Sequence, residues 1–406
     1  MRSLWYSPTL RTVVVYGASG LGFAGANLIL ARFLPTAEYA LFTLYIALAN
    51  LSFALAPIGV DGIVQRHHLD AGPTLLKHTL AAGLLTGLGT MLVGGFAYDL
   101  PPSLLALVFA STVGGGAMAV AGAQFQSEQR YGVSLALTQS PNLMLMVAAL
   151  AVIVTGIREA HLALVISSLG FVLAGIIGWW ILFRERASKP HRDTRFPWAE
   201  ALSIFGLNAA GLVLVQLDRL IIPHVLSLHD LATFGVLAAI AGSLYRVLSM
   251  GVGYSLVARL RAAGSIMKRR HLIAHEAKLV SMIVIAGSGA IWFLTPLIEQ
   301  AFLAGKYHLS GALLAATVFS GISKIMNSFS KATVTALATA KEVSIVNLLG
   351  WVCVGVAIAA AMFGARWGLA GVIYGVGLGW LVRAITAFLV TLRHLKLPES
   401  VPVTVQ

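Results

Sequence analysis

Three basic residues lie deep inside long apolar segments, where they are placed to bind an anion. Arg246, Lys324 and Arg383 are each surrounded in the sequence by mostly apolar residues. A charged side chain in hydrocarbon costs at least about 2.5–3.5 kcal/mol, so it normally faces water or a partner. A guanidinium also fits phosphate oxygens in pairs. We therefore expect these cations to line a cavity and bind a phosphate or another acidic group. The alternatives are an Arg246 bonded to carbonyls and an Arg383 paired with an acid.

The segment that contains Lys324 has one polar face. Polar residues recur there at spacings of three and four, which places them on one side of a helix. They are Ser320, Lys324, Asn327, Ser328, Lys331 and Thr335. Such a face does not point at lipid, so we expect Ser320, Asn327 and Ser328 to line the cavity. Lys331 lies near the end of the segment and is expected to extend its amine toward water.

Other polar residues give weaker indications of chemistry. Asp61 is a candidate to carry a coupling proton or cation, although a helix-end pair with Arg66 explains it more simply. His67 and His68, with His78 nearby, have no further ligand at a fixed spacing, so we predict no metal site and no cofactor. The glycines of Val113–Met118 have no Lys-Ser/Thr after them, and close helix packing accounts for them.

The elements that position these residues are transmembrane helices. Of the 406 residues, 58% are hydrophobic and only 11% are charged, whereas soluble domains average roughly 25% charged residues. Apolar runs of about 20 residues are long enough to cross a hydrocarbon core of about 30 Å. The chain is therefore predicted to be an all-α polytopic membrane protein with about twelve spans. These are 12–34, 39–64, 74–98, 102–124, 134–156, 160–183, 199–223, 231–257, 277–303, 309–338, 343–364 and 368–392.

The basic residues predict the orientation of the spans. With the N-terminus in the cytoplasm, 19 of the 28 Lys and Arg residues fall on the cytoplasmic side and five on the other side. This bias follows the positive-inside rule and places both termini in the cytoplasm. The net charge of +13 therefore reflects topology and attraction to anionic lipids, and nucleic acid is not an expected partner.

The two halves of the chain resemble each other. Phe33–Leu51 aligns without gaps with Val225–Ser243, at an offset of 192 residues, and Glu38 then matches Asp230. Six spans in each half give both halves the same orientation, so the predicted repeat is parallel. We expect a six-helix lobe over 1–183, a cytoplasmic linker over 184–198 and a second six-helix lobe over 199–406. Transporters built this way bind substrate between their halves.

Three stretches resemble the polysaccharide biosynthesis proteins, the Wzx-like flippases of the multidrug/oligosaccharidyl-lipid/polysaccharide exporter superfamily. They are ANLILARFLPTAEYALFTLYIAL (Ala26–Leu48), AQFQSEQRYGVSLALTQS (Ala123–Ser140) and LVQLDRLIIPHVLSLHDLATFGVL (Leu214–Leu237). Ala40 departs from the family pattern, which has glycine after its Glu-Tyr. The resemblance implies two six-helix bundles around a cavity that opens alternately to each side of the bacterial cytoplasmic membrane. It also implies a substrate of sugars on a polyprenyl-pyrophosphate carrier.

Two other functions compete with a flippase. A cation-coupled multidrug antiporter of the same superfamily needs carboxylates within the membrane, and Asp61 and Asp218 are near helix ends. A glycan polymerase or ligase needs a large outward loop with catalytic groups, and the predicted outward loops are short. We therefore predict no enzymatic activity. The expected partners are a lipid-linked oligosaccharide such as an O-antigen, capsule or exopolysaccharide unit, membrane lipids and other glycan-assembly proteins.

Overall fold

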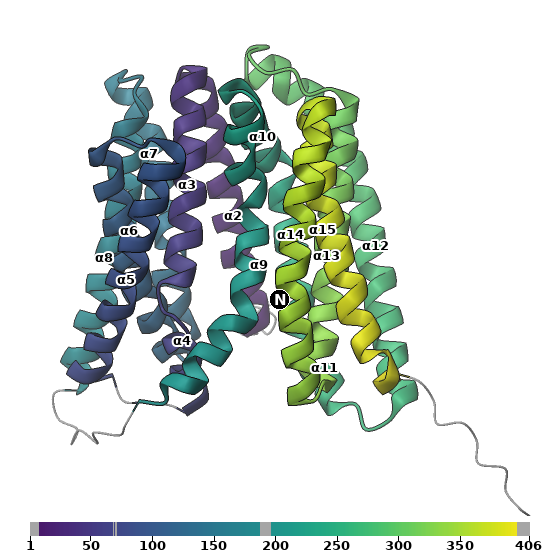
Figure 1. Ribbon diagram of the computed structural model, residues 1–406. Coiled ribbons are helices and arrows are strands. Elements are labelled where there is room, and N and C mark those ends of the chain that lie inside the picture. The colour runs from purple at the N-terminus through teal and green to yellow at the C-terminus, as the bar shows by residue number, and fades with distance from the viewer. Residues whose placement is uncertain (1–7, 68, 70, 187–195, 396–406) are drawn as a thin grey trace, which may run out of the picture. The chain divides into compact units, whose positions relative to one another are not determined.

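The computed structural model describes residues 8–67, 69, 71–186 and 196–395, and its regular structure there is helical, without strands. Figure 1 shows the helices. Their bounds are α2 (Pro8–Phe33), α3 (Thr36–Leu55), α4 (Val60–His67), α5 (Pro73–Tyr98), α6 (Pro102–Ser127), α7 (Tyr131–Thr155), α8 (Ala160–Arg186), α9 (Trp198–Val225), α10 (Leu228–Ile240), α11 (Gly242–Ala262), α12 (Ile266–Leu297), α13 (Gly311–Leu337), α14 (Ala340–Gly364) and α15 (Gly368–Thr391), with the short turns η1 (Ile298–Phe302), η2 (Ala365–Trp367) and η3 (Leu392–Leu395). The prediction of an all-α chain is confirmed.

These helices correspond to the twelve predicted spans. Ten spans are each a single helix, while the second span is the pair α3 and α4 and the eighth is the pair α10 and α11. Nine segments of the described chain are long and apolar enough to cross a membrane, and one of them, Lys341–Thr391, contains both α14 and α15. The chain is therefore a polytopic membrane protein.

The two divided spans occupy equivalent places in the predicted repeat. Helices α2 and α9 end at Phe33 and Val225, and helices α3 and α10 begin at Thr36 and Leu228. Both pairs of residues are 192 positions apart, which is the offset of the sequence alignment. The helix ends therefore agree with a repeated six-span half.

Packing divides the chain into two compact units. The first unit comprises 1–243 and 297–309, and the second comprises 244–296 and 310–406. Helices α9 and α10 pack against α3 within the first unit. The predicted lobes (1–183 and 199–406) follow the sequence repeat, and that division stays a prediction. The linker residues 187–195 lie outside the described residues.

Helix α3 is the centre of the first unit, and α5, α6, α8, α9 and α10 pack around it. The Tyr45 hydroxyl is buried and lies 3.0 Å from the Ser111 hydroxyl of α6 and 2.6 Å from the Ser168 hydroxyl of α8. Buried polar groups need such partners, since an unpaired one is costly in a low-dielectric interior. These hydrogen bonds therefore fix α3 against two neighbouring helices.

The glycine-rich stretch Val113–Met118 lies within α6 and allows close helix packing, as predicted. A Cβ atom on Gly114 would lie 2.7 Å from the Cα of Val172 in α8. A Cβ atom on Gly115 would lie 2.5 Å from the Cβ of Phe53 in α3. Small residues let helix backbones approach closely in membrane proteins.

The second unit is built around α15, which packs against both α13 and α14. Gly371, Gly375 and Gly379 recur every fourth residue and face α14, where added Cβ atoms would lie within 2.0–2.4 Å of its atoms. The thiol of Cys353 is buried in the same contact. This arrangement is the small-residue packing expected between transmembrane helices.

Candidate functional site

The three predicted substrate-binding cations belong to helices of the second unit. Lys324 lies on α13 and Arg383 on α15, and both side chains are half-buried. The Arg383 guanidinium lies 5.8 Å from the centre of the Trp380 ring, one turn earlier on the same helix. Arg246 lies on α11, but its side chain is outside the described residues. The direction in which Arg246 points therefore stays a prediction.

The polar face of α13 lies against two helices. Ser320 is buried and lies close to Gly377 of α15. A Cβ atom added to Gly377 would lie 3.1 Å from the Cα of Ser320. Ser328 is half-buried, and its hydroxyl hydrogen-bonds with the Ser249 hydroxyl of α11. Asn327 is also buried, with 7% of its surface exposed. Much of the predicted polar lining thus holds α13 between α11 and α15, and its contact with substrate stays a prediction.

Lys331 lies near the end of α13, and it was predicted only to extend its amine toward water. Its side chain is exposed in the structure, which agrees with that prediction.

The second unit carries few carboxylates to balance its basic residues. Within its described residues the acidic side chains are Glu276 and Glu342. Glu276 accepts a hydrogen bond of 2.7 Å from Arg259. Glu342 pairs with His394, so both carboxylates are engaged. The surplus of positive charge is therefore a property of the unit as well as of the sequence.

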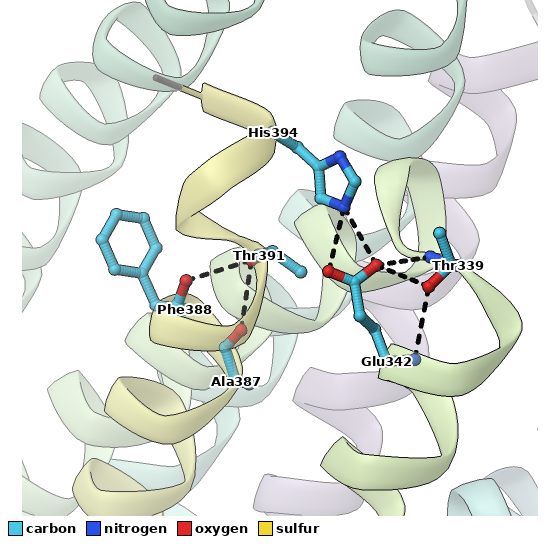
Figure 2. A network of polar contacts seen from close by, with 6 residues as sticks. All are labelled: Thr339, Glu342, Ala387, Phe388, Thr391 and His394. Carbon is cyan, nitrogen blue, oxygen red and sulfur yellow. Dashed lines mark hydrogen bonds and ion pairs between the residues drawn. The ribbon is translucent and has the colours of Figure 1, made fainter.

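Figure 2 shows the contacts of Glu342, which joins the start of α14 to η3, the turn that follows α15. Its carboxylate accepts hydrogen bonds from the backbone amide and the hydroxyl of Thr339, at 2.7 and 2.8 Å. The Thr339 hydroxyl in turn accepts from the Glu342 amide, which completes a capping box. His394 Nε2 lies 2.9 and 3.1 Å from the two carboxylate oxygens. The network clamps these two helix ends together.

Asp61 lies in the first turn of the short helix α4, after a sharp break in the chain. Ile58 and Gly59 have positive φ, and a Cβ atom on Gly59 would lie 2.0 Å from the Ala201 carbonyl oxygen of α9. Only glycine fits this close approach in that conformation. A carboxylate in the first turn interacts favourably with the helix dipole. The proposed coupling role of Asp61 stays a prediction.

Arg66 forms its ion pair with a different acid from the one expected. Its guanidinium lies 2.8 Å from the carboxylate of Glu200 on α9, instead of pairing with Asp61. His67 also contacts Glu200, at 2.9 Å, and His78 packs against the rings of Phe196 and Trp198. His68 lies outside the described residues. His67 of α4 and His78 of α5, two of the residues that had suggested a metal, therefore both make contacts at or just before the start of α9.

Charged residues also fasten the helix ends of the first unit. Arg130, between α6 and α7, donates hydrogen bonds to Glu185 of α8, and these raise the pKa of the guanidinium. Lys306 donates to the carbonyl oxygens of Ala31, at 2.8 Å, and of Leu34 at the end of α2. Burial lowers the pKa of the Lys306 amine. The segment 297–309 is thereby attached to α2.

Sequence reasoning missed a neutral polar cluster in the first unit. Ser19 of α2 donates a hydrogen bond of 2.6 Å to Gln139 of α7. Asn142, one turn further along α7, donates to both of them, at 2.7 and 3.1 Å. Two amides three residues apart in an otherwise apolar span were a signal of a polar helix face. The contact with Ser19 was not visible in the sequence.

The fold matches known transporters over nearly its full length. The match to an inward-facing multidrug resistance MATE family transporter of the MOP superfamily has a TM-score of 0.66 at 13% identity, covering 94% of this chain and 98% of that one. The match to the lipid II flippase MurJ, in an inward closed conformation, has a TM-score of 0.64 at 11% identity, covering 93% and 86%. The chain has the fold of MOP-superfamily transporters. A MATE protein in complex with MaL6 matches with a TM-score of 0.61 at 13% identity, covering 94% of this chain and 95% of that one.

Sequence comparisons do not assign the chain to a particular family. No protein-family model matches the chain, and no curated protein matches it. At identities of 11–13% the structural matches show the fold alone. The transporter fold and the multi-pass membrane location are therefore established, while the Wzx-like subfamily is not.

Proposed function

We propose that this protein is a flippase that moves a polyprenyl-pyrophosphate-linked oligosaccharide across the cytoplasmic membrane by alternating access. Arg246, Lys324 and Arg383 would contact the pyrophosphate, and Ser320, Asn327 and Ser328 would support the helix that carries Lys324. Membrane lipids would surround the protein, and other glycan-assembly proteins would supply and receive its substrate. Its N- and C-termini would lie in the cytoplasm.

The observation that carries this proposal is the surplus of basic residues in the second unit, whose described carboxylates, Glu276 and Glu342, both have partners already. Moving a pyrophosphate head group through hydrocarbon unaided would cost many kcal/mol, because an unpaired charge loses its hydration. Fixed cations in a low-dielectric site offset that cost better than cations in bulk water. The surplus of positive charge therefore favours an anionic substrate.

The likeness in fold supports a transporter for either kind of substrate. One structural match is named as a lipid II flippase, and others are named as MATE proteins, including a multidrug resistance transporter. A cation-coupled multidrug antiporter is therefore the second candidate. It needs carboxylates that bind cations within the membrane. The described acids of the second unit are already engaged with Arg259 and His394, whereas the sequence candidates Asp61 and Asp218 belong to the first unit. The charge distribution of the second unit favours the flippase.

A glycan polymerase or ligase has less support. Such an enzyme needs room outside the membrane for catalytic groups, and the connections on the predicted outer side are short. The link from α5 to α6 is Asp99–Pro101, and η2, between α14 and α15, is Ala365–Trp367.

Reconstitution into liposomes tests the proposal. A polyprenyl-pyrophosphate tetrasaccharide with a fluorescent label on its sugar would be incorporated, and the label exposed outside would be destroyed by a membrane-impermeant reductant. We expect the protein to increase the exposed fraction from about half toward completeness, with no change in the mass of the lipid. Proton-driven transport of ethidium without movement of the glycolipid would favour the antiporter. A glycolipid of changed mass would favour an enzyme.

A further inference from the structure

The neutral cluster of Ser19, Gln139 and Asn142 lies at the middle of two long helices. Ser19 is near the centre of α2 (Pro8–Phe33), and Gln139 and Asn142 are near the centre of α7 (Tyr131–Thr155). Both helices belong to the first unit and pack against each other. A polar cluster halfway along two membrane helices is at the depth where transporters of this kind bind substrate.

Neither of the two helices that form the cluster carries a charge near it. The sequence of α7 contains no Asp, Glu, Lys, Arg or His, and that of α2 has charged residues only near its ends, at Arg11 and Arg32. A bound ion would therefore have no neutralising charge on either helix. The cluster favours a ligand that is polar but neutral.

The amides are not needed to repair the backbone of α7. Pro141 lies between them and has no N–H to donate to the Leu137 carbonyl. The Ser140 hydroxyl donates to that carbonyl instead, at 2.7 Å. The amides of Gln139 and Asn142 can therefore form hydrogen bonds with each other, with Ser19 and with a ligand.

The hydrogen bonds within the cluster leave one hydrogen-bond donor and one hydrogen-bond acceptor of the two amides available. Gln139 uses its Oε1 as an acceptor and Asn142 uses its Nδ2 as a donor. Within the described residues, no hydrogen bond occupies the Gln139 Nε2 or the Asn142 Oδ1, and both side chains are half-buried. A hydroxyl group both donates and accepts, so it is complementary to this free donor and acceptor. Exposed to hydrocarbon, the two groups would instead be costly.

We propose that Ser19, Gln139 and Asn142 form a subsite that contacts hydroxyl groups of the sugar moiety of the substrate. This inference rests on the proposed flippase function and adds to it a neutral site for carbohydrate in the first unit. Ser19 closes the ring and orients both amides, whereas Gln139 and Asn142 make the contacts.

Binding to two synthetic lipids tests the subsite. Purified protein in detergent would be titrated with polyprenyl pyrophosphate that carries a tetrasaccharide and with the same pyrophosphate without sugar, and binding followed by tryptophan fluorescence. We expect Gln139→Leu and Asn142→Leu each to weaken binding of the glycosylated lipid about tenfold, the size of a lost hydrogen bond that leaves a buried partner unpaired. Binding of the sugar-free lipid should change less than about twofold, because these amides do not contact the pyrophosphate.

A matched control replaces an asparagine whose side chain forms its hydrogen bond within its own helix. The Asn27 side chain donates to the Phe23 carbonyl of α2, at 2.8 Å, and Asn27→Leu should leave binding of both lipids unchanged. If the leucine variants fail to fold, Gln139→Asn and Asn142→Ser replace them and should show a smaller selective loss. An equal loss for both lipids, or no loss, would show that the cluster only joins α2 to α7.

The wild-type protein separates failure of the subsite from failure of the proposed function. If it binds both lipids with the same affinity, the sugar makes no contact and the subsite is wrong, while the flippase proposal stands. If it binds neither lipid, the proposed function fails and the subsite fails with it.

Discussion

The Arg383 guanidinium lies 5.8 Å from the centre of the Trp380 ring, one turn earlier on α15. Helix α15 packs against α13, the helix that carries Lys324. Both basic side chains are half-buried. Arg383 and Lys324 therefore mark the place where the proposed pyrophosphate site can be tested.

Removing either charge should weaken binding of an anionic lipid. We expect Lys324→Gln and Arg383→Gln each to reduce the affinity for polyprenyl pyrophosphate about tenfold, and Arg383→Lys to reduce it less, because the charge remains while the planar fork is lost. Titration of the purified variants measures this. Arg366→Gln is the control, because Arg366 lies in η2 and packs on the Phe363 ring. If both glutamine variants bind polyprenyl pyrophosphate with unchanged affinity, the pyrophosphate does not bind at this site.

The clamp between Glu342 and His394 should contribute to stability. His394→Ala leaves the buried Glu342 carboxylate without one of its partners, which costs roughly 1–3 kcal/mol. The melting temperature in detergent should therefore fall. His308→Ala removes the similar pair with Glu299, but the His308 side chain is 86% exposed. Exposed ion pairs contribute little, so that variant should melt like the wild type. Equal melting temperatures for both variants would contradict a role for burial.

The glycines of α15 allow its close approach to α14, and one alanine should be enough to disturb it. A Cβ atom on Gly379 would lie 2.3 Å from the Cβ of Ala357, whereas a Cβ atom on Gly355 would have nothing within 4 Å. Gly379→Ala should lower the melting temperature, since overpacking costs typically about 1–3 kcal/mol. Gly355→Ala should leave it unchanged or raise it slightly. If Gly379→Ala and Gly355→Ala had the same melting temperature, α14 and α15 would not need the close approach that Gly379 allows.

The orientation predicted from the basic residues can be tested with reporter fusions. A reporter inserted after residue 188, or fused to the C-terminus at residue 406, should signal the cytoplasm, because the short basic loops remain there. A reporter inserted at Asp99, between α5 and α6, should signal the opposite side. A periplasmic signal at residue 188 would invert the topology and move the Lys306 contact with α2 to the cytoplasmic side.

The sequence by itself determined the helices and their repeat. A membrane span needs a certain apolar length, so charges and apolar runs define where each span begins and ends. They did not show that the spans 39–64 and 231–257 are each divided into two helices. The ends of α2 and α9 and the starts of α3 and α10 fall at the predicted offset. The glycines of α6 were also correctly assigned to packing, because the residues that a phosphate-binding loop requires were absent.

Only the tertiary structure decided which side chains meet. The partner of Arg66 is Glu200, 134 residues away in the sequence, and the partner of Gln139 is Ser19, 120 residues away. The burial of Ser320 against α15 and the attachment of Lys306 to α2 are further contacts of this kind. A helix that is apolar on every side has no periodic pattern to show which face packs on which neighbour. Those faces are chosen by close packing and by the need of each buried polar group for a partner, and both depend on residues far apart in the chain.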